Sequence, residues 1–255
     1  MLRRLICKLN VKAVSGKVYL PGDSLHGVLM ENIDTDFAND LHSQGLKPYS
    51  QYIEARNGEL YWVLQTLTLE AGEQIIDPII SDKFTGFYLK KINTYVEITH
   101  KVQSQTEYKE LLDRFYFDTS TRNFHLRFIT ATAFKSGGGY VFYPDWRLVI
   151  GSLMRKHSFI SSINDTNCDE EVLETLANSI RLVRYDLKSS YNTVENVRLP
   201  AFFGTISIKT NAATSLVNYL NFLLHFGEYS GLGIKCSLGM GAMRVIKKQK
   251  KGESV

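Results

Sequence analysis

His42 is the residue of this 255-residue chain with the best placement for proton transfer. Apolar side chains recur at three- and four-residue spacings from Leu25 to Leu41. With a turn and cap supplied by Pro21 to Ser24, this pattern predicts one helix that Gly45 ends. His42 would lie in the last turn, where the helix dipole favours the charged imidazole. Two interpretations follow: a helix-capping residue, or a proton donor and acceptor that titrates near neutral pH.

Three further polar side chains belong to the same predicted helix or to its end. Lys47 stands before Pro48, and proline disfavours helix at the residue that precedes it. His42, Lys47 and Tyr49 are therefore expected to leave the helix end together, and Lys47 would stabilise negative charge that develops on a phosphorane. His26 lies in the first turn of the same predicted helix, where the dipole disfavours its charged form, and it is the second candidate for proton transfer.

A glycine-rich segment near the C-terminus is the other candidate site. Gly227 to Gly241 contains five glycines in fifteen residues, with Lys235 among them. The segment has no Gly-Lys-Ser/Thr at P-loop spacing, and it follows a predicted helix and precedes a strand, the reverse of the dinucleotide-binding order. Either it makes a tight connection, or its backbone N–H groups bind an extended anion such as an RNA backbone. The number of glycines and the lysine favour RNA contact, at Gly231, Gly233, Lys235, Gly239 and Gly241.

A second glycine-rich loop, Lys135 to Tyr140, follows a strand predicted from Phe124 to Phe134. Basic and aromatic residues interleave around it, as in RNA-binding surfaces, although a solvated strand edge would have the same composition. The predicted RNA contacts here are Lys135, Gly137, Gly138 and Arg147.

Composition narrows the class of protein. The net charge is only +4, so attraction to nucleic acid must come from local patches. Cys7, Cys168 and Cys236 are far apart and without CxxC spacing, which disfavours a disulfide framework and a thiolate zinc site. The scattered histidines form no metal motif, so neither a metal nor a cofactor is expected. No apolar run reaches the length of a membrane span, and we expect a soluble cytoplasmic protein with a mobile tail at Lys247 to Lys251.

The order of predicted elements is β-α-β-β-α-β in each half of the chain. In the first half, Asn57-Gly58 predicts a hairpin turn, Glu70 to Ile76 a short helix, and Phe84 to Thr99 the closing strand. In the second half, helices are predicted after Asp145, from Asp169 to Ile180 and from Asn211 to Phe226. The fold class predicted is α+β, with tandem ferredoxin-like (RRM-like) domains at residues 1–109 and 110–255, each an antiparallel sheet with helices on one face.

Three segments resemble one protein family. The sequence is similar to the CRISPR-associated endoribonucleases that process repeat RNA, within the repeat-associated mysterious protein superfamily, and most of all to the branch found with type III systems. The resemblance rests on Asp40 to Tyr49, Phe134 to Pro144 and Gly227 to Gly241, and it spans essentially the whole chain.

The resemblance implies metal-independent cleavage of CRISPR precursor RNA within its repeats. In that family a 2′-hydroxyl attacks the adjacent phosphate and leaves a 2′,3′-cyclic phosphate and a 5′-hydroxyl. The family histidine corresponds to His42 and a nearby lysine to Lys47. Met30 stands where some relatives have a tyrosine, which leaves two alternatives: Tyr49 or Tyr52 substitutes for that tyrosine, or His42 acts with less help. Transient contact with a type III effector complex is also implied. Two alternatives are a non-catalytic RNA-binding subunit of an effector complex and a two-domain module for other single-stranded RNA.

Overall fold

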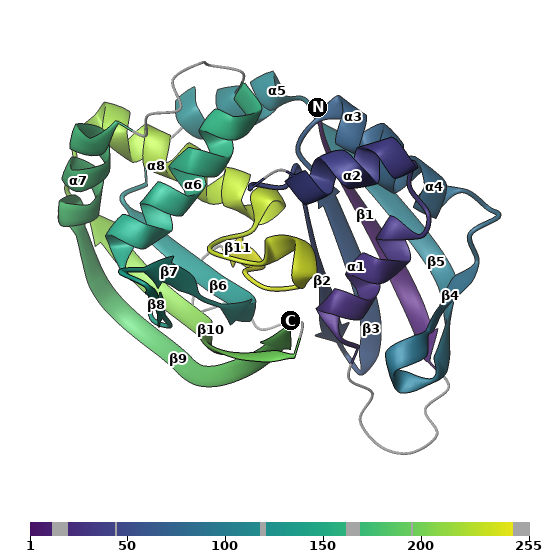
Figure 1. Cartoon of the computed structure of the whole chain (residues 1–255). Coiled ribbons are helices and arrows are strands. Elements are labelled where there is room, and N and C mark those ends of the chain that lie inside the picture. The colour runs from purple at the N-terminus through teal and green to yellow at the C-terminus, as the bar shows by residue number, and fades with distance from the viewer. Residues whose placement is uncertain (12–19, 44, 118–120, 162–168, 195, 247–255) are drawn as a thin grey trace, which may run out of the picture.

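The computed structural model describes residues 1–11, 20–43, 45–117, 121–161, 169–194 and 196–246. Two larger antiparallel sheets lie side by side, each with helices packed on one face, and the glycine-rich segment runs between them (Figure 1). The second half of the glycine-rich segment therefore belongs to the boundary between the two sheets.

The first sheet is five-stranded with the order β2-β3-β1-β5-β4. Its strands are β1 (Leu2–Val11), β2 (Tyr49–Arg56), β3 (Glu59–Thr66), β4 (Gly86–Leu89) and β5 (Thr94–Thr106). Alternate side chains of β1, Leu5, Cys7 and Leu9, are buried in one core with the helices, because successive residues of a strand point to opposite faces. The Asn57-Gly58 turn is confirmed, since both residues have positive φ, as the tightest hairpin turns require.

The predicted single helix after β1 is wrong, because the chain forms two. Helix α1 spans Gly22–Met30 and helix α2 spans Thr35–Ser43. Between them, the Asn32 side chain donates to a carbonyl of α1 at 2.7 Å. The Asp34 carboxylate accepts from the backbone N–H of Phe37 at 3.1 Å and so caps α2. Polar side chains thus divide the apolar stripe, and His26 and His42 belong to different helices.

Two other local predictions are also wrong. The N-cap residue of α1 is Pro21, which has no side-chain hydrogen bond with which to cap that helix, and not a side chain of the predicted type. The stretch Phe84 to Thr99 is not one strand, because a 3₁₀ turn (Lys90–Ile92) and the left-handed Asn93 reverse the chain between β4 and β5. Strand β5 then continues to Thr106, beyond the predicted end of the strand at Thr99, and takes the position beside β1.

A continuous helical segment connects β3 to β4. It consists of α3 (Leu69–Ala71), a π-helical turn (Gly72–Ile76) and α4 (Asp77–Ile80). Ile75, Ile76 and Ile79 pack into the same core as α1 and α2, so that all these helices cover one face of the first sheet. A short helix is confirmed here, although the helical segment is longer than predicted.

The second sheet has the order β11-β6-β10-β9. Its elements are β6 (Asn123–Thr132), α6 (Trp146–Ser161), α7 (Glu170–Ser179), β9 (Ile180–Val194), β10 (Val197–Thr210), α8 (Thr214–Ser230), a 3₁₀ turn (Cys236–Leu238) and β11 (Met243–Val245). A separate hairpin, β7 (Phe134–Ser136) and β8 (Gly139–Val141), follows β6. The helices predicted after Asp145 and from Asp169 are confirmed as α6 and α7, and the carboxylates of these two residues cap them by accepting backbone N–H bonds at 2.9 and 3.1 Å.

Both halves share the ferredoxin-like strand order, in which the first strand pairs with the third and with the last. The predicted fold class is therefore confirmed. The domain boundary between residues 109 and 110 stays a prediction. Helix α5 (Tyr108–Leu112), followed by a π-helical turn (Asp113–Phe117), spans that position, and Leu111 packs into the second core.

Several sequence-based expectations concern residues for which the structure gives no description. The lysine-rich tail and Cys168 lie outside the described residues. Cys7 and Cys236 are buried free thiols. Within the part of the chain that is described, no helix has the length and apolar character needed to cross a membrane.

Candidate active site

A cleft of about 470 Å³ opens where the two halves meet. One wall comes from α1, the end of α2 and the beginning of β2, and the other from the segment that follows α8, while α6 contributes Lys156. The lining residues are His26, His42, Gly45, Leu46, Lys47, Tyr49, Lys156, Ser230, Gly233, Ile234, Lys235, Cys236, Ser237 and Leu238. The cleft therefore contains all four predicted catalytic side chains together with part of the glycine-rich segment.

The end of α2 supplies the first wall. His42 lies in the last turn of the helix and is exposed. Lys47 turns back towards the same helix end, where its ammonium donates to the carbonyl of Leu41. Tyr49 begins β2 and is buried. The expectation that these residues leave one helix end together is thus confirmed, and the Lys47–Leu41 bond explains how the connection stays compact.

His26 reaches the same cleft from α1. Its Nδ1 lies 2.7 Å from the Tyr49 hydroxyl, and its ring centroid lies 6.3 Å from that of His42, edge to face. Burial raises the pKa of Tyr49, which outweighs the opposing effect of its hydrogen bond with Ser237. Tyr49 consequently stays protonated at neutral pH, and its hydroxyl can donate to His26.

The second wall depends on unusual backbone. Lys235 adopts left-handed geometry with φ of 56°, and Gly233 has φ of 76°. A Cβ on Gly233 would lie 2.2 Å from the carbonyl oxygen of Ala133, and one on Gly241 would lie 2.0 Å from that of Leu232. These glycines therefore allow the segment to pack against the protein's own backbone, which was one of the two interpretations of the sequence.

The charge of the cleft is positive. Lys47, Lys156 and Lys235 line it, and none of its described lining residues is acidic. Burial and then the nearby charge of Lys235 lower the pKa of Lys47. Such a surface suits an anion such as a phosphodiester, with two imidazoles for proton transfer and an ammonium for developing negative charge. Among the residues described, no group of three or more His, Cys, Asp and Glu side chains gathers as a metal site would.

Other predicted RNA contacts lie outside this cleft. Lys135, Gly137 and Gly138 are exposed on the β7–β8 hairpin. Arg147, at the start of α6, pairs with two glutamates of α7. Gly231 and Gly241 are buried, and Gly239 packs against Gly22 at the start of α1. Whether any of these contacts RNA stays a prediction.

Two lining residues were missed by the sequence reasoning. Ser237 hydrogen-bonds to Tyr49, and Lys156 lies almost wholly buried at the base of the cleft. The sequence did contain an indication of Lys156, because Val149, Leu153 and Lys156 are spaced by four and then three residues. Lys156 therefore continues the apolar stripe of α6. A lysine on a buried stripe needs acceptors, and these come from distant parts of the chain.

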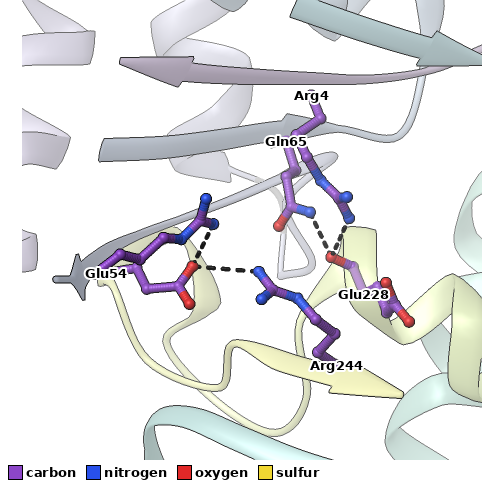
Figure 2. A network of polar contacts seen from close by, with 6 residues as sticks. Arg4, Glu54, Gln65, Glu228 and Arg244 are labelled. Carbon is purple, nitrogen blue, oxygen red and sulfur yellow. Dashed lines mark hydrogen bonds and ion pairs between the residues drawn. The ribbon is translucent and has the colours of Figure 1, made fainter. Parts of the chain in front are cut away.

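Part-buried polar contacts join the two halves of the protein. Figure 2 shows the carbonyl of Glu228, in α8, accepting from the side chains of Arg4 and Gln65 in the first sheet. In the same view, the Glu54 carboxylate of β2 pairs with Arg244 of β11 at 3.2 Å and with its own neighbour Arg56 at 2.5 Å.

Comparison with known proteins identifies the family. A CRISPR-associated endoribonuclease Cas6 from Mycobacterium tuberculosis is 38% identical over 247 residues, which are 96% of this chain and 78% of that protein. The Streptococcus thermophilus Cas6 is 34% identical over 88% of this chain and 90% of its own length. This chain belongs to the CRISPR-associated endoribonuclease Cas6 family. The family pattern described by that name matches residues 126–243.

Solved Cas6 structures share the fold. A Cas6 product complex superposes with a TM-score of 0.78 at 21% identity, over 96% of this chain and 99% of the other. Thermus thermophilus Cas6 gives a TM-score of 0.71 at 20% identity, over 96% and 98% of the two chains. The fold of this chain is therefore the fold of these Cas6 structures.

Proposed function

We propose that this Cas6 protein is an endoribonuclease that cleaves CRISPR precursor RNA within its repeats, without a metal ion. The observation that carries the proposal is the cleft in which His26, His42, Lys47 and Tyr49 face Lys235 across the boundary between the halves. Membership of a family named for endoribonuclease activity supports it. Cas6 proteins of the same fold have also been solved with product and with a substrate mimic.

His42 is the proposed proton-transfer residue. The reaction needs a base to take the proton of the attacking 2′-hydroxyl and an acid to protonate the leaving 5′-oxygen. An imidazole serves either role near neutral pH, and exposure at the open side of the cleft leaves the ring of His42 accessible to RNA. The products are a 2′,3′-cyclic phosphate and a 5′-hydroxyl.

His26 and Tyr49 form the second proton-transfer unit. A protonated Tyr49 hydroxyl that donates to Nδ1 fixes the tautomer of a neutral His26, with its proton on Nε2. The 6.3 Å between the centroids of His26 and His42 allows the two rings to contact different oxygens of one phosphate. His26, held by Tyr49, and His42 together supply the acid and the base that the reaction requires.

Lys47 is proposed to stabilise the phosphorane. Its ammonium is held at the end of α2 beside His42 and opposite Lys235. Cations positioned before the reaction stabilise developing charge better than mobile solvent does. The exposed Lys135, Gly137 and Gly138 of the β7–β8 hairpin and Arg147 would hold RNA outside the cleft, while Gly231, Gly239 and Gly241 shape the wall.

The test is cleavage of labelled repeat RNA in EDTA. We expect cleavage without added metal, a cyclic phosphate end, and no cleavage when the nucleotide before the scissile bond is 2′-deoxy. The substitution His42→Ala should lower the single-turnover rate by about 10² to 10⁴-fold. His100→Ala is the matched control, because His100 is exposed on β5 and does not line the cleft. A strict requirement for magnesium, or wild-type rates for His42→Ala, would contradict the mechanism.

Two finer parts of the proposal concern the cellular setting. We propose a cytoplasmic protein that delivers its product through transient contact with a type III effector complex. Affinity purification of the tagged protein from cells with a type III system should recover effector subunits. Recovery of RNA alone, at crosslinking conditions that preserve weak complexes, would argue against this contact.

A further inference from the structure

Lys156 is a buried ammonium that the proposed chemistry does not use. It lies on α6, lines the base of the cleft and is only 8% exposed. Burial of a charged group is costly unless hydrogen-bonding partners replace the lost water. The partners of Lys156 should therefore reveal its purpose.

All three N–H donors of Lys156 are used by the end of α8 and the segment that follows it. Its Nζ lies 3.2 Å from the carbonyl oxygen of Ser230, 2.9 Å from that of Gly231 and 3.0 Å from Sγ of Cys236. The two carbonyls belong to the C-terminal end of α8, where backbone acceptors lack helical partners and the dipole favours a cation. An ammonium has three donors, so this geometry leaves none for an RNA phosphate.

The residue next to Cys236 carries the connection onward to the reactive groups. Ser237 hydrogen-bonds to Tyr49, whose hydroxyl contacts His26. The Ser237 carbonyl also accepts from Gln51 Nε2 at 2.7 Å, and Gln51 in turn accepts from the buried Trp62 at 2.9 Å. The Cys236–Leu238 turn is thus fixed to the first half on one side and to Lys156 on the other.

We propose that Lys156 is a positioning residue: it holds the Cys236–Leu238 turn so that Ser237 orients Tyr49 and His26. The expected loss of cleavage rate rests on the proposed endoribonuclease function, whereas the role of Lys156 in holding the turn does not. Loss of the ammonium removes the hydrogen bond that ties Cys236 to α6 and leaves the packing of Leu238 as the second-half contact of the turn. The Tyr49–His26 pair then samples unproductive orientations. Misplacement of reacting groups by about 1 Å is enough to lower a rate about 10²-fold.

The test compares Lys156→Met with Lys101→Met. Lys101 is a matched control, because its ammonium also binds backbone carbonyls at and after a helix end, those of Ser81 at 2.7 Å and Phe84 at 2.6 Å, but does not line the cleft. For Lys156→Met we expect a kcat about 10 to 100-fold lower, with affinity for uncleavable 2′-deoxy repeat RNA within about threefold of wild type. Lys101→Met should lower the melting temperature and leave kcat within about threefold.

Hydrogen exchange of residues 231–241 supplies a readout that needs no cleavage. In Lys156→Met these amides should exchange at least about tenfold faster than in wild type, and in Lys101→Met they should not change. Unchanged protection, or unchanged kcat, would overturn the inference. Weakened RNA binding with normal kcat would also overturn it, because it would indicate direct contact with RNA. Failure of the wild type to cleave would instead refute the proposed function, and the exchange result would still decide the role of Lys156.

A milder pair of variants covers the case in which Lys156→Met does not fold. Cys236→Ser keeps an acceptor for the ammonium, whereas Cys236→Ala removes it. We expect Cys236→Ser to retain wild-type kcat and Cys236→Ala to lose several-fold, with faster exchange of residues 231–241. Equal activity of the two variants would contradict the proposal.

Discussion

Gly233→Ala would introduce one methyl group where the glycine-rich segment packs against the backbone of Ala133, between β6 and β7. The new Cβ would stand 2.2 Å from the carbonyl oxygen of Ala133, well inside contact distance. That same oxygen accepts the N–H of Ile234 at 3.0 Å, and the N–H of Gly233 itself donates to Ser152 at 3.0 Å. The segment must therefore move by about an ångström or break these bonds.

The cost can be estimated from two separate effects. Left-handed backbone with φ of 76° costs a residue with a Cβ about 1 kcal/mol. Overpacking against a neighbour that cannot move freely adds about 1 to 3 kcal/mol. We therefore expect Gly233→Ala to lower the free energy of unfolding by about 2 to 4 kcal/mol.

Gly58→Ala isolates the first effect. Gly58 has φ of 82°, and a Cβ there would meet no atom within 4 Å. Urea unfolding should therefore show a loss of only about 1 kcal/mol for this variant. Single-turnover cleavage should fall about tenfold or more for Gly233→Ala, because the displaced segment carries Lys235 and Ser237, and stay unchanged for Gly58→Ala. Equal destabilisation of the two variants would refute the argument that close backbone approach, and not φ alone, requires glycine at position 233.

Three further predictions concern charged and titratable groups. Lys47→Met should lower the single-turnover rate about 10²-fold, with RNA affinity changed much less, and rates measured at saturating protein test this. Burial of Glu54 by itself raises the pKa of its carboxyl, but the bonds to Arg56 and Arg244 hold that pKa below 4.5. The stabilisation by Glu54 should therefore be present above pH 4.5 and lost as pH falls through the lowered pKa. Glu54→Gln should remove this acid dependence, measured by urea unfolding at pH 7 and 3.5, and should cost about 2 kcal/mol of unfolding free energy at pH 7. Burial lowers the pKa of His157 from 6.5 to about 4. Because the unfolded chain then binds a proton more readily than the folded protein, the free energy of unfolding should fall by up to about 2 kcal/mol between pH 6.5 and 5. The same loss over that range in a His157→Phe variant would exclude His157 as the cause.

Local sequence alone predicted much of the first wall of the cleft, which contains His42, Lys47 and Tyr49. The position of His42 follows from the helix that ends beside it, and Pro48 forces Lys47 and Tyr49 into an extended chain. These relations involve residues within a few positions of one another, and short-range geometry determines them. The ferredoxin-like order was also accessible, because the periodicity of each strand and helix is local.

Errors arose where polar side chains compete with an apolar pattern. The stripe from Leu25 to Leu41 continues across the α1–α2 break, and only the bonds of Asn32 and Asp34 divide it. In the same way, Asn93 reverses a stretch that is rich in the Phe, Tyr, Val and Ile residues typical of strands.

The glycine-rich segment and Lys156 were decided by tertiary structure. The sequence established that Gly233 must have special backbone freedom, but its closest neighbour is Ala133, one hundred positions earlier. Likewise, the acceptors of Lys156 lie 74 to 80 positions away, and no periodicity along α6 can indicate them. Sequence by itself therefore determined which residues could do chemistry. Long-range packing decided that His26, His42 and Lys235 share one cleft, because close contacts between distant segments form only when both sheets are in place.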